Sequence, residues 1–203
     1  MGSGHASEIK STSVDKIACK RQTELMSKSQ KTKETLLQEA RAQFWSRGFS
    51  NVSVRDISKA AGVDVALISR YFGSKLELFE TTLQDLPLLN TDAIKNADQL
   101  IEQVVNLFAA ATRDGNNGTA TSLILRNATD PEVGEMVRDL YSRTWHQSLV
   151  QILGSKTKAT RFSAAVFGMS IAEGSLMLDG MPPHRSGEYK EELTSFLRAS
   201  IDG

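Results

Sequence analysis

Apolar residues along much of the chain recur at intervals of three and four, which is the spacing of one face of an α-helix. The first clear run starts at Thr32 and ends at Gly48, and its apolar positions are Leu36, Leu37, Ala40, Phe44 and Trp45. Three shorter helices follow, preceded by the capping residues Ser53, Asp64 and Ser74, and the last of them ends near Pro87. The pattern predicts a compact group of short helices in this part of the chain.

The rest of the chain keeps the helical spacing. We expect helices at about 92–112, 117–128, 131–154, 157–179 and 188–201, separated by breaks rich in Gly, Asn and Pro. No segment alternates with the period of two that a half-buried strand shows. The sequence therefore predicts an all-α protein.

Residues 1–29 are polar, rich in Ser and Lys, and show no sustained period. The first five residues resemble a tag, and we expect the rest of this segment to be a disordered arm, with the alternative that it reaches DNA. We therefore predict three parts: the arm at 1–29, a helix-turn-helix DNA-binding domain at 30–75, and a larger helical domain at 76–203.

Residues 52–79 carry the outline of a helix-turn-helix. Ser53 and Asp56 form a start like a capping box, and Ala60, Ala61 and Gly62 allow a close helix crossing. Arg55 lies near the start of the second helix, and Lys75 is the first residue of the fourth. Positive side chains and capping hydroxyls at such places are suited to phosphate contact.

The formal net charge of zero conceals an asymmetry along the chain. Residues 28–75 carry nine basic and four acidic side chains, a net of +5, whereas residues 76–203 carry a net of −6. A basic module joined to an acidic body suits a protein that contacts a polyanion with one end. Ordinary variation of surface charge is the alternative explanation.

Composition excludes several classes of protein. No apolar run approaches a membrane span or a signal peptide, and the single Cys19 fits a reducing cytosol, so we expect a cytoplasmic protein. Three widely spaced histidines do not suggest a metal site, and no motif implies a cofactor. An enzyme is disfavoured because the chain has no nucleophile elbow, phosphate loop or zinc-protease motif, and Glu173 and Asp179 lie six residues apart.

From Thr32 to Phe79 the order and spacing of residues resemble the TetR family of transcriptional repressors. The resemblance includes Phe44, the run from Val54 to Val63, and the aromatic pair with its Ser-Lys that runs from Tyr71 to Leu78. It implies an N-terminal DNA-binding head, joined to a helical domain for ligand binding and dimerisation. The DNA-contacting positions that it implies are Arg55, Val65, Ala66, Ser69, Arg70, Tyr71 and Lys75, to which we add Ser53 because the hydroxyl of a capping residue is suited to phosphate contact.

Within that set, Tyr71 and Lys75 match positions that clamp the DNA backbone, while Val65, Ala66 and Ser69 match base-facing ones. Val65 and Ala66 offer apolar contact to thymine methyl groups but no bidentate hydrogen bond. We therefore expect Arg70 or Arg55 to make many of the hydrogen bonds that recognise the bases.

The C-terminal body offers candidates for an apolar small-molecule effector. Mixed methionine and aromatic side chains suit an adaptable chamber, although an ordinary filled core is the alternative for each. The candidates are Phe108, Met136, Tyr141 and Trp145, with Arg126, Asn127 or His146 as polar anchors.

The helix at 157–179 mixes small and large apolar residues, which allows a second helix to approach closely. We expect it to form a two-fold four-helix interface together with the last helix, because a symmetric operator requires a homodimer. Intramolecular packing is the alternative. The interface candidates are Phe162, Ala165, Val166, Met169, Glu173, Leu176 and Phe196.

Together these expectations predict a homodimeric repressor that binds a near-palindromic double-stranded operator and is released by its effector. The helix after Ser74 joins the DNA-binding part to the body, and we expect it to transmit the effector's signal. A transcriptional activator or a ligand-independent regulator with the same DNA reader is the competing interpretation.

Overall fold

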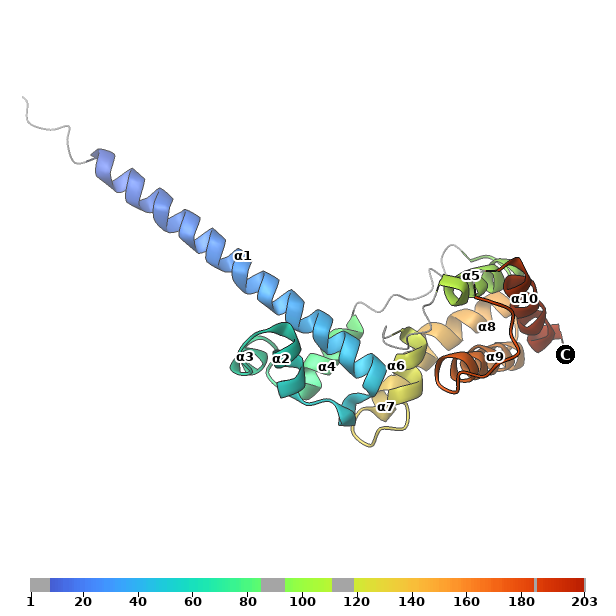
Figure 1. Ribbon diagram of the computed structural model, residues 1–203. Coiled ribbons are helices and arrows are strands. Elements are labelled where there is room, and N and C mark those ends of the chain that lie inside the picture. The colour runs from blue at the N-terminus through green and yellow to red at the C-terminus, as the bar shows by residue number, and fades with distance from the viewer. Residues whose placement is uncertain (1–7, 85–93, 111–118, 185, 203) are drawn as a thin grey trace, which may run out of the picture.

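The computed structural model describes residues 8–84, 94–110, 119–184 and 186–202, with side chains from residue 28 onward. Every regular element in these ranges is helical, which confirms the all-α prediction (Figure 1). The N-terminal elements are α1 (Glu8–Arg47), the 3-10 turn η1 (Phe49–Asn51), α2 (Val54–Ala61), α3 (Ala66–Phe72) and α4 (Lys75–Gln84). The body contains α5 (Ala97–Ala110), α6 (Ala120–Asn127), α7 (Gly134–Tyr141), the π-helical turn η3 (Ser142–His146), α8 (Gln147–Leu153), α9 (Lys156–Gly174) and α10 (Gly187–Asp202).

Helix α1 begins well before Thr32, and its N-terminal half extends away from the other helices as a single rod (Figure 1). The segment from Glu8 to Ser29 is therefore helical, and the prediction of a disordered arm was wrong there. Residues 6–47 contain neither Gly nor Pro, so no residue interrupts the helix that starts in the packed head. Residues 1–7 lie outside the described part of the chain.

Several helix ends differ from the expected ones. Helix α5 begins at Ala97 rather than at 92, because the Asn96 side chain accepts the Gln99 backbone N–H at 3.0 Å. The expected helix at 131–154 is α7, η3 and α8 in succession. Helix α9 ends at Gly174 rather than at 179, and Met177 beyond it has a φ of 51°. The ends expected near 87, 92, 112 and 117 lie outside the described residues.

The buried apolar side chains form two clusters. The first joins α1–α4 to α6, α7 and η3, and its largest members include Phe44, Trp45, Phe49 and Phe79. The second lies among α5, α8, α9 and α10, around Phe162 and Tyr189. The first cluster therefore crosses residue 75, the expected end of the DNA-binding domain, and α6 and α7 pack against the head.

A buried amide fastens α6 to the head. Asn127 is fully buried, and its Oδ1 accepts the Phe49 backbone N–H at 2.7 Å. Its Nδ2 donates to the carbonyl oxygens of Phe44 at 3.2 Å and of Leu123 at 2.9 Å. Asp130 adds an exposed link, since its Oδ2 accepts the Ser50 hydroxyl at 2.6 Å. Polar contacts therefore hold the head in one orientation on the body.

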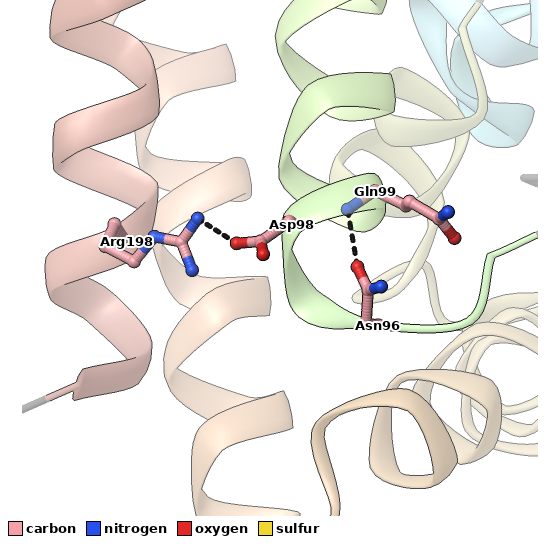
Figure 2. A network of polar contacts seen from close by, with 4 residues as sticks. All are labelled: Asn96, Asp98, Gln99 and Arg198. Carbon is pink, nitrogen blue, oxygen red and sulfur yellow. Dashed lines mark hydrogen bonds and ion pairs between the residues drawn. The ribbon is translucent and has the colours of Figure 1, made fainter.

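At the far end of the body, α5 and α10 are tied together by an ion pair. Figure 2 shows Arg198 of α10 reaching Asp98 in the first turn of α5, beside the Asn96 cap. Both side chains are substantially exposed, so the pair orients the two helices more than it stabilises them. Leu100, Leu193 and Leu197 form the buried contact beneath it.

Candidate nucleic-acid interface

Helix α2 starts with a complete capping box. The Ser53 hydroxyl accepts the Asp56 backbone N–H at 3.1 Å, and the Asp56 carboxylate accepts the Ser53 backbone N–H at 3.0 Å. The hydrogen bond from the Ser53 backbone is the main reason that the pKa of Asp56 lies below its ordinary value. The Ser53 hydroxyl also donates to the Asp56 carboxylate at 2.8 Å, so its hydrogen is not free for a phosphate as the sequence suggested.

The turn between α2 and α3 is set by Gly62, whose φ of 68° lies in the left-handed region that favours glycine. Asp64 then accepts the Ala66 backbone N–H at 2.7 Å and starts α3. Ile68 and Phe72, four residues apart, are buried and anchor α3 in the first cluster. The opposite face of α3 consequently points away from the head's core.

The outward side of the head carries most of the residues that the family resemblance implied. Arg55 on α2 and Ala66, Ser69 and Arg70 on α3 are exposed, and Val65, immediately before α3, is 40% exposed. These side chains are accessible to a groove without any rearrangement of the fold. The structure therefore brings the expected base-facing positions together on one surface.

Tyr71 is half-buried at the edge of this surface. Its hydroxyl lies 3.1 Å from the hydroxyl of Ser29, which belongs to the segment that the sequence analysis placed in a disordered arm. Its ring packs edge-on against Phe72 at 6.4 Å between centroids. The hydrogen bond to Ser29 therefore holds the end of α3 against α1.

Lys75 at the start of α4 is also half-buried. Its Nζ lies 4.0 Å from the centroid of the Phe49 ring, a cation–π contact that keeps the ammonium close to the head. Ser74 caps the same helix by accepting the Glu77 backbone N–H at 3.1 Å. The charge at position 75 thus sits beside the first turn of α4, where the helix dipole also favours an anion.

Further basic side chains surround these positions. Lys28, Lys31, Arg47 and Lys59 are exposed, and Lys33 lies with its Nζ 5.6 Å from the Phe72 ring centroid. The cationic groups expected from the charge count are therefore on the surface of the folded head. A basic exterior of this kind supplies the sequence-independent part of DNA affinity.

The expected effector residues do not form one group. Met136, Tyr141 and Trp145 pack with the first cluster, whereas Phe108 packs with the second. Arg126 is exposed on α6, and Asn127, considered as a polar anchor, is occupied by the head joint. The structure therefore does not bring Phe108 together with Trp145, because apolar spacing indicates a buried face without specifying its neighbours.

Tyr141 and Trp145 nevertheless form an aromatic group around the π-helical turn. The Tyr141 ring lies 5.9 Å from Trp145, 6.2 Å from the half-buried His146 and 5.5 Å from Phe167. Burial raises the pKa of Tyr141, although its hydroxyl donates to the Ser163 hydroxyl at 2.6 Å. This buried phenol with a polar partner can orient a ligand only if the local packing opens.

An open hollow of about 320 Å³ lies on the outer face of α5. Its lining contains none of the expected effector residues and consists of Gln99, Glu102, Gln103, Asn106 and Leu107. Because its lining lies on α5 alone, this hollow gives no support to an effector chamber around Tyr141.

The expected dimer residues divide into buried and exposed sets. Phe162 and Ala165 are buried in the second cluster among the protomer's own helices, and Glu173 is buried against Tyr189 of α10, so none of the three is accessible on the surface of the protomer. Val166 and Met169 are half-buried, and Leu176 and Phe196 are exposed. Ile171, Met177 and Leu178 are further exposed apolar residues in and after α9.

Two polar sites were not anticipated from the sequence. The Tyr189 hydroxyl donates to the buried Glu173 carboxylate at 2.8 Å, and the His184 ring stacks on Tyr189 at 4.6 Å between centroids. The other is the bond between Asn127 and Phe49, residues that lie far apart in the sequence. The available signal for Asn127 was its position four residues after Leu123, as a polar residue on the apolar face of its helix.

Comparison with known proteins places the head in a family. Residues 36–82 match the family model described as "Bacterial regulatory proteins, tetR family". No curated protein sequence matches the chain. Among the described residues, no helix has both the length and the apolar content of a membrane span.

Solved structures share the fold of most of the chain at low sequence identity. NalD, described as the secondary repressor of the MexAB-OprM multidrug efflux pump in Pseudomonas aeruginosa, is 16% identical with a TM-score of 0.59, covering 86% of this chain and 96% of NalD. HlyIIR, described as a Hemolysin II transcriptional regulator, is 18% identical with a TM-score of 0.54, covering 86% of this chain and 97% of HlyIIR. Residues 36–82, which contain the exposed and basic helix-turn-helix, therefore match the tetR family of bacterial regulatory proteins, and the all-helical fold of the chain is similar to that of these solved regulators.

Proposed function

We propose that the chain is a homodimeric repressor that binds a near-palindromic operator and is released by a small-molecule effector. The observation that carries this proposal is the shared core between head and body. Because the first cluster includes residues of α6, α7 and η3, a shift of these helices must move the head or break its packing.

The release step needs an effector that binds one arrangement of the head better than the other. The buried Asn127 fastens α6 to the head, while α6 also packs against α1. Helix α4 also packs against α1 and against α3, so it remains the second route by which a change in the body reaches the DNA-reading surface. Tyr141, Trp145 and Phe167 belong to or pack against the first cluster. Because this aromatic group is largely apolar, it favours an apolar effector that carries one hydrogen-bonding group.

A homodimer is supported by the apolar side chains that the protomer leaves exposed. Leu176, Met177 and Leu178 follow α9 and are 61%, 69% and 53% exposed, and Phe196 on α10 is 45% exposed. Large apolar side chains that a protomer leaves exposed are typical of protein interfaces. A two-fold pair would present two copies of α3 to major grooves about 34–36 Å apart on one face of the duplex.

Repression is supported by the description of NalD as a repressor, together with the shared fold. The test begins with selection of bound sequences from a random DNA pool. The operator is then placed between a promoter and a reporter gene, and the chain is expressed from a separate plasmid. Lower reporter output that a small molecule restores supports the proposal, whereas higher output in the presence of the chain would establish an activator.

A further inference from the structure

We propose that, at the operator positions facing Val65 and Ala66, this regulator selects bases through the 5-methyl groups of pyrimidines in the major groove. The inference rests on the proposed entry of α3 into the major groove. It goes further by naming the chemical group on the DNA that determines sequence preference. The outward side of α3 supplies the evidence.

Val65 is the first observation. Among the described residues of the head, it is the one large apolar side chain that is clearly exposed, while the large apolar side chains of α3, Leu67, Ile68 and Phe72, are packed into the first cluster. The surrounding surface is basic, with Arg55, Lys59 and Arg70 exposed nearby on α2 and α3. An apolar residue in the middle of a cationic surface fits a partner that combines phosphates with small apolar groups, and duplex DNA has this combination in its major groove.

At positions 64–69 the polar side chains are few, and one of them is already engaged. Ser69 lies one turn after Val65 and Ala66 and offers a single hydroxyl, which accepts or donates to any base. Asp64 turns back to cap Ala66, and the Tyr71 hydroxyl is bonded to Ser29. No Asn, Gln, Lys or Arg occupies positions 64–69, so these positions hold no amide for adenine and no cationic fork for guanine.

Apolar contact must therefore provide discrimination at these positions. In the major groove the apolar group that distinguishes one base from the others is the C5 methyl of thymine. Val65 carries two methyl groups and Ala66 one, and both are accessible on the surface. 5-Methylcytosine carries the same methyl group at the same place, so it should satisfy this face of the protein as thymine does.

The test replaces single thymines of a selected operator by deoxyuridine, which keeps base pairing and removes only the methyl group. Full-length chain is titrated against each duplex by fluorescence anisotropy. At contacted positions we expect roughly fourfold weaker binding per methyl removed, from about 0.8 kcal/mol per buried methyl-sized group. Replacement of a contacted thymine by cytosine should weaken binding, and 5-methylcytosine at that position should restore part of it.

Two variants separate a protein contact from an effect of deoxyuridine on DNA shape. Val65→Ser should bind thymine and deoxyuridine duplexes more equally than the wild-type chain, whereas Lys59→Ser, on the exposed face of α2, should leave their ratio unchanged. Sequence-specific binding in which no deoxyuridine substitution matters, or in which Val65→Ser keeps the full ratio, would refute the methyl readout while leaving the regulator intact. Absence of any preferred sequence in the selection would refute the proposed function itself.

Discussion

Asn127 offers the sharpest test of how the head is held on the body. Asn127→Ala removes the acceptor of the Phe49 backbone N–H and the donor to the Phe44 carbonyl, which are the two hydrogen bonds from α6 to the head backbone. The Phe44 carbonyl keeps a second partner, because the Gly48 backbone N–H donates to it at 3.0 Å. The Phe49 N–H has no comparable substitute, and its residue is buried.

The magnitude follows from these contacts. A buried donor left without a partner costs about 1–3 kcal/mol, and each of the two bonds from Nδ2 contributes about 0.5–1.5 kcal/mol. We therefore expect Asn127→Ala to lower the free energy of unfolding by about 3 kcal/mol. For a chain of this size, that loss corresponds to a decrease in Tm of roughly 6–12 °C.

The assay is urea and thermal unfolding followed by circular dichroism, at one protein concentration because dimerisation affects Tm. Ser50→Ala is the matched control, since it removes the exposed hydroxyl bond to Asp130 at the same joint. The free energy of unfolding of this control should fall by less than about 1 kcal/mol. If Asn127→Ala were no less stable than Ser50→Ala, the buried amide would not be what fastens the head, and its role in transmitting an effector signal would lose its basis.

Three further predictions concern the DNA surface, the dimer and the first capping box. Lys75→Ala should weaken operator binding and reduce the slope of log Kobs against log salt by about 1, and an unchanged slope would mean that Lys75 does not neutralise a phosphate. Leu176→Glu should shift the chain toward monomer in sedimentation velocity, whereas Leu107→Glu on α5 should not, and a dimer that tolerates the first change must use another face. Because the pKa of Asp56 is lowered in the folded chain by its bond from Ser53, its contribution to stability is present above its ordinary value of 3.8 and is lost as pH falls through the folded pKa. In urea unfolding, the free energy of unfolding of Asp56→Asn should therefore fall less steeply than that of the wild type as the pH drops below about 4. An equally steep fall in both proteins would contradict this cause.

The sequence was most informative where structure depends on neighbouring residues. The Ser53 and Asp56 capping box, the left-handed Gly62 and the Ser74 cap are local signals, and each has its expected role in the folded head. Family resemblance covered the same stretch, and most of the DNA-contacting positions that it implied are exposed on the folded head, although their contact with DNA stays a prediction.

Long-range packing was less predictable. The apolar spacing of α9 correctly indicated a buried face at Phe162 and Ala165, but it could not specify whether the cover comes from the same protomer or from a partner. The N-terminal half of α1 has no amphipathic period, and only the absence of Gly and Pro from residues 6–47 favoured a helix there. The joint at Asn127 depends on a partner 78 residues away, for which sequence spacing provides no signal.

The central claim is that two copies of the basic head bind one duplex through specific contacts. The most direct measurement is a titration of selected operator DNA with the full chain, at several salt concentrations, with sedimentation used to count protomers per duplex. The account predicts two protomers on each operator, a preference of at least about a thousandfold over scrambled DNA, and affinity that falls steeply with salt. Equal affinity for operator and scrambled duplex, with no dependence on salt, would contradict it.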